Sequence, residues 1–270
     1  MKFTVFGGAG FVGSRLVSTL SEKGHECRVP GRDEILDLEK PLGHAVWCIG
    51  LTSDFRERPF DTMEAHAGLL AEVLRRARFV SFTYLSSTRV YRRCKVGDER
   101  ALPHVDPTDP MDLYDISKLA GEALCLGMDR PQARVARISN VYGGDFDSGN
   151  FLSSVLTDAA RKYHVHFATS PRSEKDYVHV DDVAWALERI ALAGRERVYN
   201  VASGTNVSNG AIARHLKKIG ACTTEFATAA PVIRMPPVKI ERLAGEFGFT
   251  PRALLDDLAE LIEMFRKGAG

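Results

Sequence analysis

The fold of this chain is decided by residues 2–13, which read Lys2-Phe3-Thr4-Val5-Phe6-Gly7-Gly8-Ala9-Gly10-Phe11-Val12-Gly13. A short buried strand is predicted over residues 2–6. A helix is predicted over residues 11–23, where apolar residues recur with a helical period. Residues 26–29 read as a second strand, so this part of the chain forms a βαβ unit, the building block of a parallel sheet.

The glycines at positions 7, 10 and 13 lie directly between the first strand and the helix. Glycine permits a tight turn and lets backbone N–H groups and the positive end of the helix approach a pyrophosphate. The turn therefore predicts a dinucleotide cofactor that contacts Gly7, Gly10, Phe11, Val12 and Gly13. A glycine-rich turn without a ligand is the competing interpretation.

Apolar runs and helical patterns then alternate along the chain. Strands are predicted at residues 45–49, 79–85, 134–138, 165–167, 177–180 and 198–201, and helices at 61–77, 112–128, 150–162, 181–192, 209–218 and 251–265. Only residues 33–45 separate the turn after the second strand from the third strand, so the helix there should be short or absent. The pattern predicts an α/β fold with a Rossmann-like, doubly wound parallel sheet.

A smaller C-terminal lobe is expected to close over the cofactor and bind the substrate. Residues 1–145, joined again by residues 173–203, are predicted to form the dinucleotide-binding domain. Residues 146–172 and 204–270 are predicted to form the lobe.

Composition excludes several classes of protein. Lysine and arginine number 36 against 35 acidic residues, a balance without the electrostatic footprint of a nucleic-acid or membrane-surface protein. No apolar run approaches the roughly 18 residues that span a bilayer. The five cysteines lack metal-site or disulfide spacing, and the first strand leaves no room for a signal peptide, so we expect a cytoplasmic protein with a small-molecule substrate and no metal.

Tyr114 and Lys118 are spaced for a proton shuttle. Residues at i and i+4 lie on one face of a helix, so the Lys118 ammonium can approach the Tyr114 phenol. At ~4 Å and an effective dielectric near 20, two unit charges interact by about 4 kcal/mol, and one pKa unit is about 1.36 kcal/mol. We therefore expect Lys118 to lower the pKa of Tyr114 and Tyr114 to act as the acid or base.

The choice between NAD and NADP depends on the end of the second strand, which reads Val29-Pro30-Gly31-Arg32. An acidic residue there binds the ribose hydroxyls of NAD, whereas a basic residue favours the 2′-phosphate of NADP. Arg32 therefore favours NADP(H) over NAD(H), although Asp33 beside it weakens the distinction. Arg32 as a solvated loop residue is the alternative.

Further motifs recur in order: Leu85-Ser86-Ser87-Thr88-Arg89-Val90-Tyr91, Arg137-Ile138-Ser139-Asn140-Val141-Tyr142-Gly143, Lys175-Asp176-Tyr177-Val178-His179-Val180-Asp181-Asp182-Val183 and Tyr199-Asn200-Val201. With the glycine turn and the Tyr114/Lys118 pair, they make nearly the whole chain resemble the extended short-chain dehydrogenase/reductase family. This family contains the NAD-dependent epimerases, dehydratases and 4-ketoreductases of nucleotide sugars.

The resemblance implies roles for individual residues. It makes Ser87 a third catalytic residue that holds the reacting sugar oxygen, with Thr88 as the alternative at that position. It implies that Lys118 also holds the nicotinamide ribose and that Asp37, Gly50 and Ile138 contact the cofactor.

The resemblance further implies a nucleotide-diphosphate sugar as the substrate. It puts Asn140 near the diphosphate and Lys175 at a phosphate-contacting position that is usually arginine. Arg234 is a second phosphate contact or merely a surface charge. A possible homodimer through the helix that bears Tyr114 is also implied.

One departure from the family pattern bears on the reaction. Dehydratases of the family place Asp-Glu after the catalytic threonine, whereas Thr88 is followed here by Arg89. The first hypothesis is therefore an NAD(P)-dependent reductase of a keto group on a nucleotide sugar or similar polyol. The alternatives are a nucleotide-sugar epimerase that retains its NAD(H) and, in another class, a non-catalytic NADP-binding sensor. Two further departures, His66 in place of asparagine and Arg92 in place of glycine, indicate an unusual substrate preference.

Overall fold

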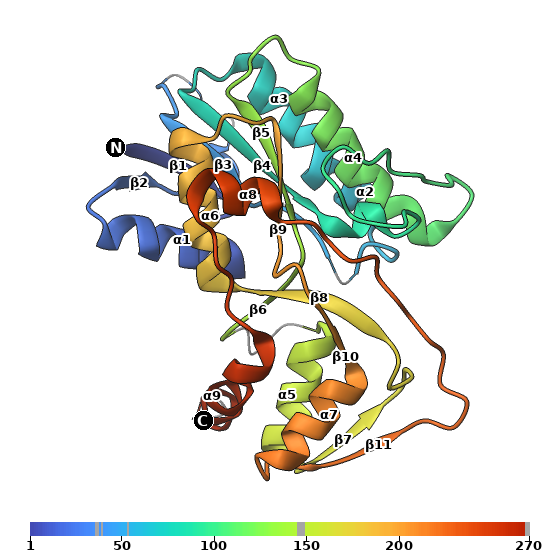
Figure 1. Ribbon diagram of the computed structural model, residues 1–270. Coiled ribbons are helices and arrows are strands. Elements are labelled where there is room, and N and C mark those ends of the chain that lie inside the picture. Colours follow the sequence, from blue (N-terminus) through green and yellow to red (C-terminus); the bar gives the residue numbers. More distant parts are fainter. Residues whose placement is uncertain (36–37, 39, 53, 145–148, 268–270) are drawn as a thin grey trace.

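The computed structural model describes residues 1–270 except 36–37, 39, 53, 145–148 and 268–270. Its centre is a parallel sheet in the order β2-β1-β3-β4-β5-β9, drawn in the upper half of Figure 1. The strands are β1 (Lys2–Phe6), β2 (Glu26–Arg28), β3 (His44–Trp47), β4 (Ser81–Ser87), β5 (Ala133–Ile138) and β9 (Val198–Val201).

Helices cover both faces of this sheet. On one face α1 (Phe11–Glu22) and α6 (Val180–Ala193) pack together over a core that contains Phe3 and Val5 of β1. On the other face α3 (Leu69–Arg76) and α4 (Leu113–Leu126) cover a second core that contains Phe6. Successive side chains of a strand point to opposite faces, and β1 has buried side chains on both faces because both are covered. The predicted doubly wound α/β fold is confirmed.

The strand order reverses direction at β1, which lies between β2 and β3. In such sheets ligands bind beyond the carboxyl ends of the strands, at this switch point. The connection from β2 to β3 contains, in its described part, only the 3-10 turn η1 (Arg32–Glu34), so the prediction of a short or absent helix is confirmed there.

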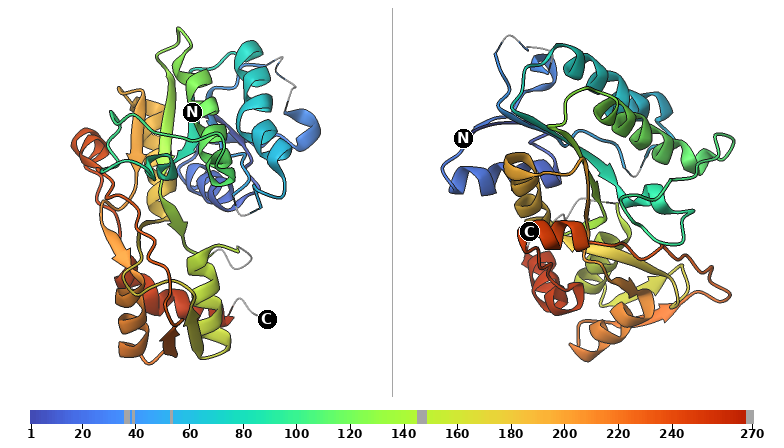
Figure 2. Two further views of the ribbon diagram at one scale, coloured as in Figure 1. Left: turned by 90° about the vertical axis from the view of Figure 1, so that its right-hand side faces the viewer. Right: turned by 45° about the horizontal axis from the view of Figure 1, so that its top comes forward.

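A smaller group of elements lies below the main sheet in Figure 1 and in both views of Figure 2. It contains a three-stranded sheet β10-β8-β6 and a two-stranded parallel sheet β11-β7. Its strands are β6 (Asn140–Tyr142), β7 (His164–Phe167), β8 (Glu174–His179), β10 (Asn206–Ser208) and β11 (Thr223–Phe226), and its helices are α5 (Phe151–Arg161), α7 (Asn209–Lys218) and α9 (Leu254–Lys267).

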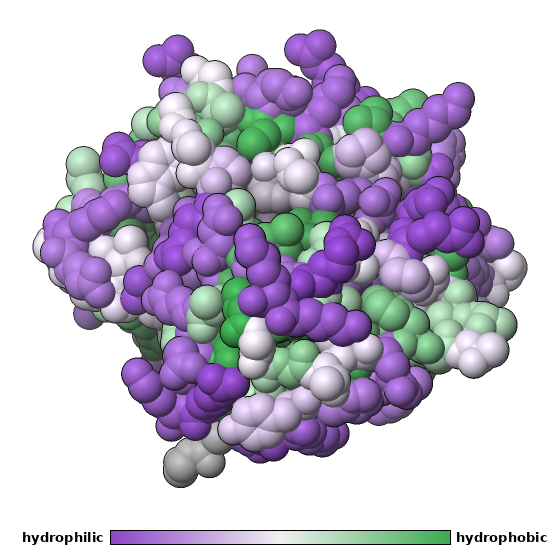
Figure 3. All heavy atoms as spheres, turned by 60° about the horizontal axis from the view of Figure 1, so that its bottom comes forward, coloured by the Kyte–Doolittle hydropathy of each residue, from purple (hydrophilic) through white to green (hydrophobic). Residues whose placement is uncertain are grey.

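This smaller group has a hydrophobic core of its own, to which α5, α7 and α9 contribute Leu156, Ile212 and Leu258. Hydrophilic side chains cover most of the face seen in Figure 3, and hydrophobic ones show mainly between them near its middle. The remaining helix, α8 (Glu241–Phe247), packs against β9 and buries Leu243 in the main core. The exact domain boundaries stay a prediction. No helix among the described residues is long and apolar enough to cross a membrane.

Candidate functional site

Tyr114 and Lys118 lie one turn apart on α4 and are buried against β4, with 7% and 5% of their surfaces exposed. The Lys118 Nζ lies 5.8 Å from the centre of the Tyr114 ring. It donates a hydrogen bond to the Leu85 carbonyl at 3.0 Å. The predicted pair therefore shares one face of a helix, as the spacing required.

Ser87 ends β4 and begins the 3-10 turn η3 (Thr88–Tyr91). Its Oγ accepts a hydrogen bond from the Arg89 N–H at 3.2 Å, which caps the turn. The same hydroxyl is close enough to the Tyr114 phenol for a hydrogen bond that lowers the phenol pKa. The predicted residues Ser87, Tyr114 and Lys118 thus come together, while Thr88 is buried beside them. Their catalytic roles stay predictions.

The electrostatics of Tyr114 differ from the sequence-based expectation. Burial raises the pKa of Tyr114 to about 12, and hydrogen bonding to Ser87 and the charge of Arg89 only partly oppose this. Burial also lowers the pKa of Lys118 to about 7, against the opposing effects of Cys48 and Glu122. The protein's own groups therefore do not produce the low phenol pKa, because desolvation penalises both charged forms.

His66 connects α4 to the loop after β3. The ring lies in the π-helix η2 (Glu64–Gly68), between α2 (Pro59–Met63) and α3, and is fully buried. Burial, followed by the charge of Lys118, lowers the pKa of His66 to about 2, so the ring is neutral. The Leu51 N–H lies 3.1 Å from Nε2, which assigns the proton to Nδ1.

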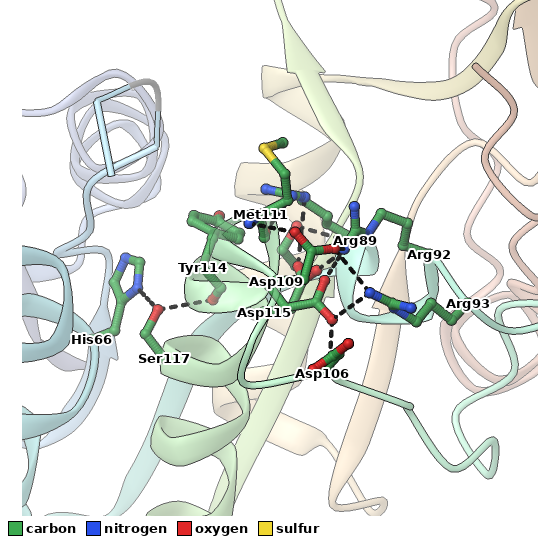
Figure 4. Close-up of polar contacts among 12 residues, drawn as sticks. His66, Arg89, Arg92, Arg93, Asp106, Asp109, Met111, Tyr114, Asp115 and Ser117 are labelled. Carbon is green, nitrogen blue, oxygen red and sulfur yellow. Dashed lines mark hydrogen bonds and ion pairs between the residues drawn. The ribbon is translucent and has the colours of Figure 1, made fainter. Parts of the chain in front are cut away.

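From Nδ1, His66 donates to the Ser117 Oγ at 2.7 Å, and Ser117 donates to the Tyr114 carbonyl at 2.8 Å. Figure 4 shows His66 and Ser117 beside Tyr114. The ring of His66 also meets the Tyr114 ring edge to face at 5.4 Å. Sequence reasoning noted His66 only as a departure from the family pattern, because its partners are distant in the chain.

The glycine turn has the geometry of a pyrophosphate cradle. Gly7 has a φ of +74°, a conformation that glycine adopts readily. A Cβ on Gly13 would lie 2.2 Å from the Gly7 oxygen, so a side chain would open the turn. Gly10, the N-cap of α1, provides no side-chain acceptor for the N–H groups of Phe11, Val12 and their neighbours. These residues fit the phosphates of a dinucleotide.

The other residues predicted to bind the cofactor are Gly50, Ile138, Arg32 and Asp37. A Cβ on Gly50 would lie 3.3 Å from the Lys118 Nζ, so the backbone passes directly beside the predicted catalytic amine. Ile138 ends β5 opposite Ser87. Arg32 is exposed in η1, where the Gly31 N–H donates to Glu34 instead. Asp37 lies outside the described residues.

The predicted substrate residues lie on and around β8. The Asn140 amide donates to the Asp176 carbonyl at 2.8 Å. The Lys175 Nζ lies 5.1 Å from the centre of the Phe151 ring. Arg234 is exposed, and its backbone pairs with Glu174, the residue before Lys175 in β8. Among the described residues, no group of three or more His, Cys, Asp or Glu side chains could hold a metal ion.

Arg89 is a site residue that the sequence did not predict. Its guanidinium carbon lies 5.4 Å from the centre of the Tyr114 ring and 5.2 Å from that of Phe55. Arg92 and Arg93, by contrast, contact Asp109 and Asp112 ahead of α4 (Figure 4). These two arginines hold the loop before the helix.

Comparison with known proteins places this geometry in context. The model of the NAD dependent epimerase/dehydratase family matches residues 3–202. A dTDP-glucose 4,6-dehydratase of Streptomyces niveus is 26% identical over 209 residues, which cover 73% of this chain and 61% of that protein.

A 3 beta-hydroxysteroid dehydrogenase/Delta 5-->4-isomerase of Mycobacterium tuberculosis is 25% identical, over 96% of this chain and 80% of its own length. A structure of MoeE5 in complex with UDP-glucuronic acid and NAD superposes with a TM-score of 0.83 at 22% identity, covering 99% of this chain and 100% of that one.

Proposed function

Because the chain belongs to the NAD dependent epimerase/dehydratase family of enzymes, we propose that it reduces a keto group of a nucleotide sugar or similar polyol, with Tyr114 as the acid. The observation that carries this proposal is the meeting of Ser87, Tyr114 and Lys118 at the carboxyl end of β4, with an arginine after Thr88. Strand β4 belongs to the same sheet as β1, which leads into the glycine turn. Dehydration needs an acid and a base at neighbouring carbons, and Arg89 supplies neither.

In the proposed mechanism Ser87 and Tyr114 hold the substrate carbonyl oxygen between their hydroxyls. When bound, the nicotinamide cofactor supplies the hydride. Tyr114 gives its proton to the developing alkoxide, and its burial keeps the phenol protonated, the state that a proton donor needs. Lys118 orients the ribose and polarises the phenol, and His66 with Ser117 fixes the first turn of α4.

The proposed cofactor is NADP(H) in preference to NAD(H), on the basis of Arg32. The change Arg32→Ala tests it through separate titrations of NADPH and NADH. We expect the affinity for NADPH to fall and that for NADH to stay within about twofold, because only a 2′-phosphate pairs with the guanidinium. Equal losses for the two cofactors would exclude this contact.

The experiment that tests the proposed reaction is the change Tyr114→Phe, with the exposed Tyr163→Phe as a matched control. Removal of the phenol proton should reduce turnover of 4-keto nucleotide sugars by about 10²–10⁴-fold, while NADPH affinity is unchanged. Turnover is followed by NADPH absorbance with UDP-, dTDP- and GDP-linked substrates. Retained turnover in Tyr114→Phe would remove Tyr114 from the reaction.

An epimerase that retains its cofactor shares this site, and the NAD in the MoeE5 complex supports it as the second candidate. The two reactions are separated by denaturing the purified protein and assaying the released nucleotide. Release of stoichiometric NAD(H), with no consumption of added NADPH, would replace the reductase with the epimerase. Oxidation of a 3β-hydroxysteroid with added NAD(P)⁺, followed by the appearance of NAD(P)H, would move the substrate class away from sugars.

A further inference from the structure

Arg89 lies beside Tyr114, and only part of its guanidinium takes part in hydrogen bonds or ion pairs. Its Nη2 donates to the Met111 carbonyl at 2.8 Å, and its Nε lies 3.5 Å from the Asp115 Oδ1. None of the described residues accepts a hydrogen bond from its Nη1. The side chain is 23% exposed, so it is not sealed in the core.

Among the described residues, the carboxylate nearest to Arg89 makes only a long ion pair with it, at 3.5 Å. Asp115 is buried, its Oδ1 has no hydrogen-bond partner, and its Oδ2 lies 3.7 Å from the Nε of Arg92. Burial raises the pKa of Asp115 to about 6, since the surrounding arginines only partly stabilise its charge. Arg93, in contrast, reaches its carboxylates at 2.9 and 3.0 Å.

A second cation nearby, Lys175, has no carboxylate partner among the described residues. Lys175 forms no ion pair with any described carboxylate and covers the Phe151 ring instead. Burial lowers the pKa of Lys175, and the charge of Arg89 lowers it further, so the two cations repel each other. A partly buried, unpaired charge costs free energy that an anionic ligand would remove.

We propose that Arg89 binds a carboxylate on the sugar ring next to the reacting carbon, while Lys175 binds the diphosphate, so that the substrates are nucleotide-linked uronic acids. This inference rests on the proposed function, because it assumes that the reacting carbon lies at Tyr114. The free Nη1 and the neighbouring Nη2 edge offer a carboxylate two N–H donors, the geometry in which arginine recognises carboxylates. A neutral hydroxymethyl group in the same place would leave Arg89 with no described carboxylate closer than the Asp115 Oδ1, at 3.5 Å.

The test compares UDP-glucuronic acid with UDP-glucose by isothermal titration of the protein with its cofactor. We expect the wild-type protein to bind the acid about tenfold more tightly or better, the usual effect of hydrogen bonds to a charged group. The variant Arg89→Met should lose this preference, and Arg89→Lys should recover part of it.

Arg56→Met is the matched control, because Arg56 also lies over the Phe55 ring, at 5.9 Å, but is exposed and further from Tyr114. It should keep the full preference. Equal affinity of the wild-type protein for both sugars would overturn the role of Arg89 and leave the proposed function intact, and this measurement needs no variant. A similar loss of both sugars in Arg89→Met would reduce Arg89 to a packing role.

Failure to bind UDP-glucuronic acid, UDP-glucose or dTDP-glucose would instead overturn the proposed function itself. Cofactor affinity and the melting temperature of each variant show whether the fold and the glycine turn are intact. The outcomes therefore distinguish a wrong substrate class from a wrong reaction.

Discussion

Helix α4 is held at two places by ion pairs, of which one group is partly exposed and the other is buried. Ahead of its first turn, Arg92 and Arg93 contact Asp109 and Asp112, and the two arginine side chains are 28% and 40% exposed. One turn beyond Lys118, Glu122 meets Arg137, and both side chains are nearly inaccessible. Tyr114 and Lys118 lie between the two anchors, so a displacement of α4 at either anchor would move the Tyr114 hydroxyl.

The inner anchor is fully satisfied. Arg137 forms two hydrogen bonds with Glu122, at 2.6 and 2.9 Å, and Ser86 donates to the same carboxylate at 2.5 Å. The third nitrogen of Arg137 donates to the Tyr91 hydroxyl, which donates in turn to Asn200. Buried polar networks are costly when incomplete, so this anchor specifies one position of α4 against β4 and β5.

The outer anchor has more than one contact to the same carboxylate, and it leaves buried polar atoms without a hydrogen-bond partner. Asp112 is 1% exposed; one of its oxygens contacts Arg92, and the other accepts from the Asp106 N–H and lies 3.0 Å from Arg93. The Nε of Arg92 has no hydrogen-bond partner. The difference between the anchors indicates that the core fixes the helix, whereas the solvent-side arginines adjust its first turn.

The largest effect is expected from Arg137→Met. The change leaves the Glu122 carboxylate buried without its charge partner, and we expect the free energy of unfolding to fall by about 3–5 kcal/mol. Urea denaturation followed by circular dichroism measures the loss. The double variant Glu122→Leu/Arg137→Met should recover much of it, because removing both charges removes the uncompensated one. A single-variant loss below about 1 kcal/mol would contradict the importance of this pair.

A smaller effect is expected from Arg92→Ala. Asp112 keeps Arg93 and the Asp106 N–H, so the loss should be about 1–2 kcal/mol, the cost of one lost contact to a buried charged group. Arg58→Ala is the control, since its ion pairs with Asp54 and Asp61 are exposed and should contribute little to stability. Equal losses in the two variants would mean that the outer anchor is an ordinary surface salt bridge.

The sequence predicted the parts of the fold that local patterns determine. The helix and strand at residues 209–218 and 198–201 have the predicted bounds, and α4 differs from its prediction by one or two residues at each end. The three-residue strands β6 and β10 were missed, because pairing with β8 rather than their own sequence makes them strands. The helix α8 was also missed, since seven residues carry little periodicity.

The site also has some features that local sequence determines and others that only tertiary packing determines. The four-residue spacing of Tyr114 and Lys118 could be predicted because helix geometry alone brings them together. Arg89, Phe55 and His66 reach Tyr114 only through tertiary packing, which no spacing reveals. The direction of the Tyr114 pKa was missed for the same reason, because the expectation counted the Lys118 charge and not the burial of both groups.

The smallest of the three effects concerns Asp115, which lies between the two anchors. Burial raises its pKa from 3.8 to about 6 in the folded protein, so folding takes up a proton between these values. Its contribution to stability therefore increases as the pH falls from 7.5 to 5, whereas the neutral ring of His66 makes an opposite contribution below pH 6.5.

The difference in unfolding free energy between wild type and Asp115→Asn cancels the His66 contribution at each pH. We expect this difference to change by about 1 kcal/mol in favour of the wild type between pH 7.5 and 5. Asp109→Asn is the control, because hydrogen bonding to the Met111 N–H lowers the pKa of Asp109 and confines its effect to more acidic solutions. Urea titrations at the two pH values give both differences. If the Asp115→Asn difference does not depend on pH, Asp115 is fully ionised in the fold and already neutralises Arg89, which would also weaken the case for a carboxylate ligand at that arginine.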